Sequence, residues 1–238
     1  MSSIDSSAGE GLSAVLGSVA RSLQAEPNVD TTIAAIVKAA VDHVAGADYA
    51  GISLVEHGRI RTVAPTDEVV VTIDEVQYRT KQGPCVNAIA EHQVFRTGDL
   101  AAEARWPKFT PAAAATGMRS MLAYRLFVSE NTLGSLNLYS RSVEAFSDQT
   151  EQAGRVFASH AAIALIGAQT EARLNIALGH RDVIGMAKGI LMQRHGIDAV
   201  EAFRLLIESS QATNIKLHQV AEWFVEHHRE LSPRGSKS

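Results

Sequence analysis

The order of hydrophobic and polar residues in the first part of the chain changes from a helical period to a strand period. Apolar residues recur at three- and four-residue spacing over residues 30–46, which predicts an amphipathic helix with Asp30 as its N-cap. Two β-prone runs follow at residues 49–55 and 59–64. The His57-Gly58 step between them is typical of the tight turn of a hairpin.

A second pair of β-prone runs lies near the middle of the chain. In residues 120–128, successive side chains would point to the two faces of a strand in turn, with leucines and a tyrosine on one face. After a polar turn, residues 133–139 resume the strand pattern. Strands that flank a helical insert predict an α+β domain in which helices cover both sides of an antiparallel sheet. Helix signals in the insert lie at residues 67–78, 85–91 and 107–115.

From Ser147 or Asp148 to Met192 the pattern is helical and contains no proline. Such a helix is too long to be buried in one globular domain, and its mixed three- and four-residue spacing favours a seam against the same helix of a second chain. We therefore expect a homodimer that also uses surfaces of the first domain and a helix at residues 12–23. The predicted seam consists of Ala153, Phe157, His160, Ala164, Ala168, Glu171, Leu174 and Leu178.

Beyond the long helix the pattern predicts two shorter helices, so that an all-α three-helix bundle ends the chain. Gly196 is the expected left-handed C-cap, and Asp198 with Glu201 has the spacing of a capping box. A third helix begins near Ile215. The predicted buried stripes are Ala199, Ala202, Phe203 and Leu206 on one helix, and Leu217, Val220, Ala221 and Phe224 on the other.

The run from Arg181 to Met192, RDVIGMAKGILM, combines an apolar stripe with two cations and two glycines. Arg181 and Lys188 are seven residues apart on one side of the helix and are the first candidates for phosphate contacts. A glycine inside a helix is destabilising by roughly 1 kcal/mol relative to alanine, so the pair Gly185 and Gly189 suggests that a helix or ligand approaches the backbone closely. Second candidates are Arg194, Asn214, Lys216 and His218. For a generic helix, a solvated cationic face would be the simpler interpretation.

Residues 174–225 resemble an ANTAR domain, the RNA-binding module of bacterial antitermination regulators. The resemblance implies recognition of a hairpin loop, with the Lys188-Gly189 step and nearby polar residues in contact with RNA, and loop bases are indeed accessible in a way that an A-form major groove is not. The sequence departs from the family at Ile207, Glu208 and Ile215, where arginines are common. The resemblance rests on Arg181, Ile184, Ala187 to Met192, Gly196, Ala202-Phe203, Ser210, Asn214, Lys216-Leu217 and Val220-Ala221.

The α+β part resembles a GAF domain of the kind that precedes ANTAR modules in actinobacterial regulators. GAF domains share a fold and bind very different ligands, so the resemblance implies a sensor whose small-molecule or protein signal stays unknown. Candidate pocket residues are Tyr78, Cys85, Trp106, Phe109 and Tyr124, for which simple core packing is the alternative. The resemblance is carried by Gln82-Gly83-Pro84-Cys85, Asp99, Trp106-Pro107, Gly117 and the run Leu133 to Tyr139.

These patterns divide the chain into four segments. We expect a disordered N-terminus at residues 1–11, a GAF-like sensor at residues 12–165, a connecting and dimerisation helix at residues 147–180, and an ANTAR domain at residues 171–232.

Charge and cysteine content restrict the possible functions. The net charge of the 238 residues is −4, and residues 171–238 hold nine Lys and Arg against eight Asp and Glu, so any RNA contact must come from a local cluster. Cys85 is the single cysteine, which excludes an internal disulfide and multi-cysteine zinc sites; a redox-sensing thiol is the less favoured interpretation because no second thiol could resolve it. Neither a membrane segment nor a signal peptide is predicted, so a cytoplasmic protein is expected.

Catalytic motifs are missing from the sequence. It has no glycine-rich phosphate loop, no G-x-S-x-G and no spacing of histidines that favours haem or another metal, so we expect neither an enzyme nor a bound cofactor. The preferred function is an RNA-binding transcription antitermination regulator. A DNA-binding transcription factor is the first alternative, disfavoured because Glu222, Glu226 and Glu230 on the last helix would repel a duplex. The second alternative is an enzyme or a pure ligand-binding protein whose tail serves assembly alone.

Overall fold

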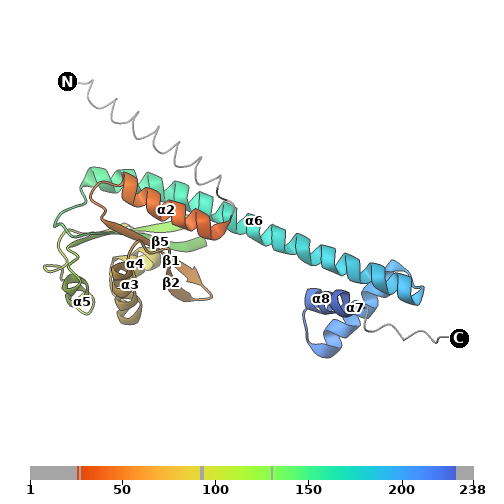
Figure 1. The fold of residues 1–238 in the computed structure, drawn as a ribbon. Coiled ribbons are helices and arrows are strands. Elements are labelled where there is room, and N and C mark those ends of the chain that lie inside the picture. Colours follow the sequence, from red (N-terminus) through yellow and green to blue (C-terminus); the bar gives the residue numbers. More distant parts are fainter. Residues whose placement is uncertain (1–25, 27, 92–93, 130, 229–238) are drawn as a thin grey trace, which may run out of the picture. The chain divides into compact units, whose positions relative to one another are not determined.

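The computed structural model describes residue 26 and residues 28–91, 94–129 and 131–228 (Figure 1). These residues divide into two units, the first ending at Thr170 and the second beginning at Glu171. The helix expected at residues 12–23 and the disorder expected at residues 1–11 both lie outside the described residues.

Unit 1 contains a five-stranded antiparallel sheet with the strand order β2-β1-β5-β4-β3. Both predicted hairpins are present, and the first turns through positive φ angles of 51° at His57 and 77° at Gly58. The four-residue edge strand β3 was not predicted. The strands are β1 (Tyr49–Glu56), β2 (Arg59–Val63), β3 (Val94–Thr97), β4 (Ser120–Val128) and β5 (Asn131–Ser140).

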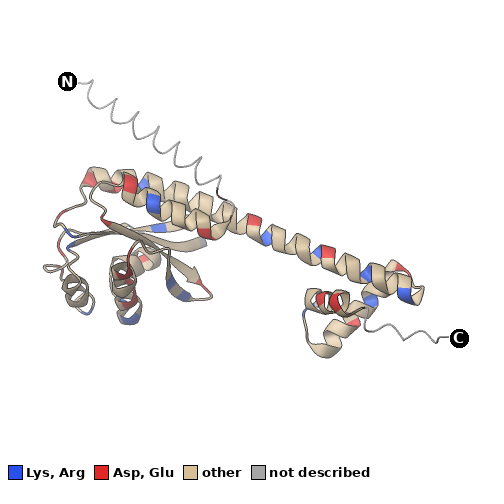
Figure 2. Cartoon of the chain, in the orientation of Figure 1, with Lys and Arg blue, Asp and Glu red and all other residues tan. Residues whose placement is uncertain are grey.

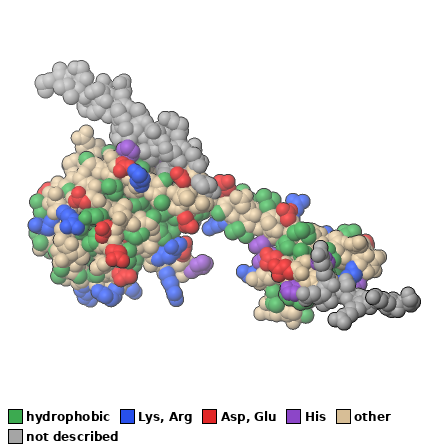
Figure 3. Space-filling view, viewed as in Figure 1, with side chains coloured by type: hydrophobic (Ala, Val, Ile, Leu, Met, Phe, Trp, Pro, Cys, Tyr) green, Lys and Arg blue, Asp and Glu red, His purple; other side chains and the backbone are tan. Residues whose placement is uncertain are grey.

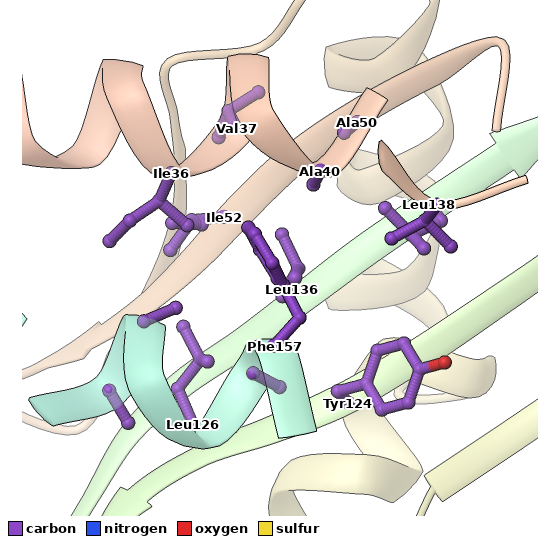
Figure 4. Close-up of a cluster of buried hydrophobic side chains, with 14 of the residues drawn as sticks. Ile36, Val37, Ala40, Ala50, Ile52, Tyr124, Leu126, Leu136, Leu138 and Phe157 are labelled. Atoms are coloured by element: carbon purple, nitrogen blue, oxygen red, sulfur yellow. The ribbon is translucent and has the colours of Figure 1, made fainter. Parts of the chain in front are cut away.

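One face of this sheet is apolar and is covered by α2 (Val29–His43) and the first part of α6 (Asp148–His195). Alternate strand residues such as Ile52 and Leu136 point to this face, where Phe157 of α6 packs among them (Figure 4). Because Phe157 is only 3% exposed in the core of its own chain, its assignment to a dimer seam is wrong.

The opposite face is covered by three helices: α3 (Glu68–Thr80), α4 (Pro84–Glu91) and α5 (Thr110–Ala115) (Figure 1). An apolar cluster that includes Trp106, Phe109 and Met121 fills one part of this layer. Polar side chains from β1, β2 and β5 meet α3 and α4 in the rest of it. The α+β class with helices on both sides of the sheet is confirmed.

Two predicted helix starts are wrong by a few residues. Helix α2 is capped by Asn28, whose side chain accepts a hydrogen bond of 3.0 Å from the Thr31 backbone N–H, while Asp30 lies inside the first turn. Asn28 serves as the N-cap instead of Asp30 because its backbone is extended, as the backbone of an N-cap residue must be. Helix α5 begins at Thr110, because residues 107–109 form a turn before it.

The described part of unit 2 has helices as its regular secondary structure, as predicted: the last part of α6, α7 (Ala199–Thr213) and α8 (Leu217–His227). Gly196 has the predicted positive φ of 63°. Asp198 caps α7 through hydrogen bonds from the Val200 and Glu201 backbone N–H groups, but the Glu201 side chain pairs with Arg204, so the capping box is half formed. The buried core consists of Ala187, Leu191, Ala202, Leu206 and Ala221.

Helix α6 contributes to both cores through different parts of its length. In unit 1 its buried residues include Ala161 and Leu165, and in unit 2 they include Ala187 and Leu191. Among its apolar residues in between, Leu174 is 60% exposed and Leu178 is 54% exposed. None of the helices in the described part of the chain is long and apolar enough to cross a membrane.

Candidate functional site

A groove on unit 2 lies between one face of α6 and the side of α7. We call it the cationic groove; its volume is about 560 Å³, within the range of ligand sites. Residues spaced by three, four and seven positions share a helix face, which is why this stretch of α6 presents Arg181 and Lys188 together. The lining residues are Ala177, His180, Arg181, Ile184, Gly185, Lys188 and Phe203.

The two fixed positive charges of the groove have no carboxylate partner within the described part of the chain. Arg204 on α7 differs, because Glu201 and Glu208 both pair with it. Its hydrogen bonds lower the pKa of Glu201 below the ordinary value. Arg181 and Lys188 are therefore free to meet an external anion, while the charge of Arg204 is compensated.

Lys188 lies above an aromatic ring. Its ammonium nitrogen is 5.5 Å from the centroid of the Phe203 ring, within the range of a cation–π contact. Phe203 was predicted to be buried in the bundle, and this prediction is wrong, since the residue is 38% exposed. Ala202 and Leu206 fill the core in its place, and Phe203, about 100° around the helix from Ala202, faces the groove.

Two imidazole rings meet beside the groove. His180 of α6 stacks on His218 of α8 with ring centroids 3.6 Å apart and an angle of 12° between the planes. The stack joins two helices and fixes the ring of His180 at the edge of the groove. His218, a predicted contact residue, therefore lies beside the groove. His180 was not predicted as a groove residue, because a single histidine at a helical position carries no signal of its own.

The other predicted contact residues have local structural roles or lie outside the groove. Arg194 donates a hydrogen bond of 3.0 Å to the backbone carbonyl of His228. Asn214 is the left-handed C-cap of α7, with φ 55°, and Lys216 is the N-cap residue of α8 without a side-chain cap bond. A Cβ added at Gly189 would meet nothing within 4 Å, so this position is open.

Charge is distributed unevenly over unit 2. The exposed residues Glu222 and Glu226 lie on α8 and appear as its red bands in Figure 2. On the visible face of unit 1, charged side chains of both signs are interspersed (Figure 3). A local pair of cations, and not a general positive field, is what the groove offers to an anion.

A buried polar cluster lies in unit 1 between the sheet and helices α3 and α4. Asp74 is its acidic member; it accepts hydrogen bonds from the Thr62 hydroxyl at 2.8 Å, the Gln77 amide at 2.9 Å and the Tyr139 hydroxyl. Burial is the largest influence and raises the pKa of Asp74 to about 6, although the hydrogen bonds oppose it. The cluster consists of Ser53, Thr62, Asp74, Gln77, Tyr78, Cys85, Ser135, Asn137 and Tyr139.

Cys85 occupies the first turn of α4, as its position after Gly83-Pro84 predicts. The thiol is fully buried, with its Sγ 3.1 Å from the hydroxyl oxygens of both Ser53 and Ser135. Burial raises the pKa of the Cys85 thiol to about 12, so desolvation outweighs any lowering by the helix N-terminus. This environment favours a structural thiol over a redox-active one.

The five candidate pocket residues do not surround one site. Tyr78 and Cys85 belong to the buried polar cluster, while Trp106 and Phe109 pack in the neighbouring apolar cluster. Tyr124 lies on the opposite face of the sheet, where its hydroxyl donates a hydrogen bond to the Glu151 backbone carbonyl of α6 at 3.1 Å. Grouping Tyr124 with the others is therefore wrong. Side chains alternate along β4, so Met121 points to the face with Trp106 and Phe109, whereas Tyr124, three residues later, points to the other face. In the described residues, no three His, Cys, Asp or Glu side chains gather in a way that could hold a metal ion.

Comparison with family models agrees with this division into a sheet unit and a helical unit. A GAF domain model matches residues 26–166, and an ANTAR domain model matches residues 172–225. Both are regulatory domains, so the two matches fit a regulator that consists of a sensor and an output module. The chain belongs to the GAF domain family and carries an ANTAR domain after its sensor.

Solved structures support the fold of unit 1. A GAF domain from a phosphoenolpyruvate-protein phosphotransferase of Coxiella burnetii is 14% identical, with a TM-score of 0.55, and the match covers 68% of this chain and 96% of that one. The free methionine-R-sulfoxide reductase of Neisseria meningitidis is 14% identical, with a TM-score of 0.53 and coverage of 67% and 91%. At this identity the likeness shows the fold alone. Comparison with curated proteins gives no match.

Proposed function

We propose that this protein is an RNA-binding transcription antitermination regulator and not an enzyme. Its GAF domain receives a small-molecule or protein signal, and its ANTAR domain binds the hairpin loops of nascent mRNA. One observation carries the proposal: Arg181 and Lys188 lie together in an open groove of the ANTAR domain without a carboxylate partner among the described residues. Phosphate groups of a single-stranded loop are the anions that such a groove suits.

Binding of a hairpin stabilises it against competing RNA structures, because a ligand favours the conformation to which it binds. A hairpin that excludes a terminator would then allow transcription to continue. Two ANTAR domains held in one dimer would bind paired stem-loops far more tightly than either domain alone, provided their separation suits the RNA.

Removal of the two cations should abolish most of the RNA affinity. RNA stem-loops with a fixed stem and a randomised loop are first selected on the full-length protein, and affinities of the selected RNA are then measured against salt concentration. We expect Arg181→Gln with Lys188→Gln to lower affinity by about a hundredfold and to reduce the slope of log K against log salt by about 1.4, roughly 0.7 for each lost phosphate contact. Helical content should stay unchanged.

A matched control separates this local effect from the loss of overall charge. Lys38→Gln with Arg61→Gln removes two cations from unit 1, both of which pair with carboxylates, Asp42 and Glu56. This variant should bind the selected RNA as the unchanged protein does. Equal affinity of all three proteins, or preferential binding of duplex DNA in competition, would contradict the proposed function.

The proposed homodimer is supported by exposed leucines of α6. Leu174 and Leu178 are four residues apart, so they lie on one helix face, and more than half of each is exposed. Burial of such residues against a second copy of α6 would remove apolar surface from water. Leu174→Lys with Leu178→Lys should shift the protein from dimer to monomer in sedimentation velocity, while the exposed Val200→Lys should leave the dimer intact; a monomeric unchanged protein would refute the proposal.

A further inference from the structure

The cationic groove combines a flat apolar surface with positive charge. Phe203 is more than one-third exposed, and the ammonium group of Lys188 lies over its ring. Gly185 contributes no side chain, and a Cβ added there would meet nothing within 4 Å. One wall is thus aromatic, part of the opposite face is open backbone, and the charged groups flank the space between them.

An unpaired nucleotide has the matching chemistry. Its base is flat and can stack on an aromatic ring, and its phosphates need cations beside that ring. A phosphate alone would leave the Phe203 ring without a role, whereas a paired base has both of its faces covered by its neighbours. The lining residues include no carboxylate that would repel the nucleotide.

We propose that the cationic groove takes one unpaired base of the RNA loop, stacked on Phe203, while Arg181 and Lys188 contact the phosphates on either side. This inference rests on the proposed RNA-binding function and names the part of the RNA that the groove binds. Lys188 occupies the ring face in the free protein. On binding, its flexible side chain moves to a phosphate and the base replaces it on the ring.

The first test removes the aromatic ring. Phe203→Leu keeps an apolar side chain without a ring, and we expect it to lower the affinity of the full-length protein for the selected stem-loop about tenfold. The slope of log K against log salt should not change, because no cation is lost. Phe203→Trp should bind as well as the unchanged protein.

The second test removes the base. Each loop nucleotide is replaced in turn by an abasic one, and one position should reduce the affinity of the unchanged protein about tenfold. The same abasic RNA should bind Phe203→Leu no more weakly than the complete RNA does, because the contact is already lost. Full sensitivity of Phe203→Leu to every abasic position would overturn the inference.

A third variant blocks the groove without weakening the helix. Gly185→Leu places a side chain in the groove and raises helix propensity, so a loss of RNA binding cannot come from unfolding of α6. The matched control is Gly179→Leu, an equally open position of α6 outside the groove, which should bind normally.

The outcomes separate this inference from the proposed function. If the unchanged protein selects no stem-loop, the proposed function itself fails. If the Arg181 and Lys188 variant loses affinity for the RNA while Phe203→Leu and Gly185→Leu keep it, the proposed RNA-binding function is supported and the stacking of a base on Phe203 is refuted.

Discussion

The stability advantage that the unchanged protein has over an Asp74→Asn variant should fall by about 2.4 kcal/mol between pH 4 and pH 7. Asp74 has a pKa of about 6 in the folded protein against an ordinary value of 3.8. The unfolded chain therefore releases this proton first as the pH rises. The stabilising contribution of the protonated carboxyl is fully present well below the unfolded pKa of 3.8, decreases as the pH rises from 3.8 to 6, and is lost above 6. At about 1.4 kcal/mol for each unit of pKa difference, the complete loss is about 3 kcal/mol.

This difference can be measured by urea unfolding followed through tryptophan fluorescence. The chain has two tryptophans, Trp106 in unit 1 and Trp223 in unit 2, so Trp223→Phe leaves a reporter of unit 1 alone. The control is Asp99→Asn, because hydrogen bonds from Arg119 lower the pKa of Asp99. Its difference curve should have the opposite sign, with stability gained as the pH rises through the lowered pKa. A flat Asp74 curve would contradict the burial effect.

Gly134→Ala should lower the free energy of unfolding of unit 1 by about 3 kcal/mol or more. Gly134 lies in β5 with φ 156°, and an added Cβ would be 1.8 Å from the Ser53 backbone oxygen of β1. Neither atom can move without a shift of one strand against the other. The measurement is again urea unfolding followed by Trp106.

The control for this substitution is Gly58→Ala in the first hairpin turn. Gly58 also has a positive φ, 77°, but an added Cβ would meet nothing within 4 Å. The expected cost is about 1 kcal/mol, from the backbone conformation alone. Similar losses for the two variants would show that β1 and β5 tolerate a wider separation at Gly134.

The hairpins and helices of this chain could be predicted because their signals are local. Strand alternation and the His57-Gly58 turn depend on a few neighbouring residues only. The same holds for the Gly196 C-cap and the Asp198 N-cap. Strand β3 has four residues and owes its existence to pairing with β4, a contact between distant parts of the chain. A run that short has no period from which it could be recognised.

The residues of the two candidate sites also differ in whether their signals are local. Arg181 and Lys188 were predictable, because their spacing alone places them on one face of a helix. The orientation of Phe203 depends on how α7 packs against α6, which periodicity does not determine. The buried polar cluster was predicted only through two of its members, Tyr78 and Cys85. Ser53 and Asn137 are polar residues that would suit the solvent side of a strand, and only the covering helices make that face an interior one.

The hydrogen bond from Arg194 to the His228 carbonyl sets a minimum length for any recombinant ANTAR fragment. The family match ends at residue 225, three positions before the acceptor. A fragment cut at that limit would lose this acceptor and the last two residues of α8. Fragments of the ANTAR domain should therefore extend at least to residue 228, so that the contact between α6 and the end of α8 is kept.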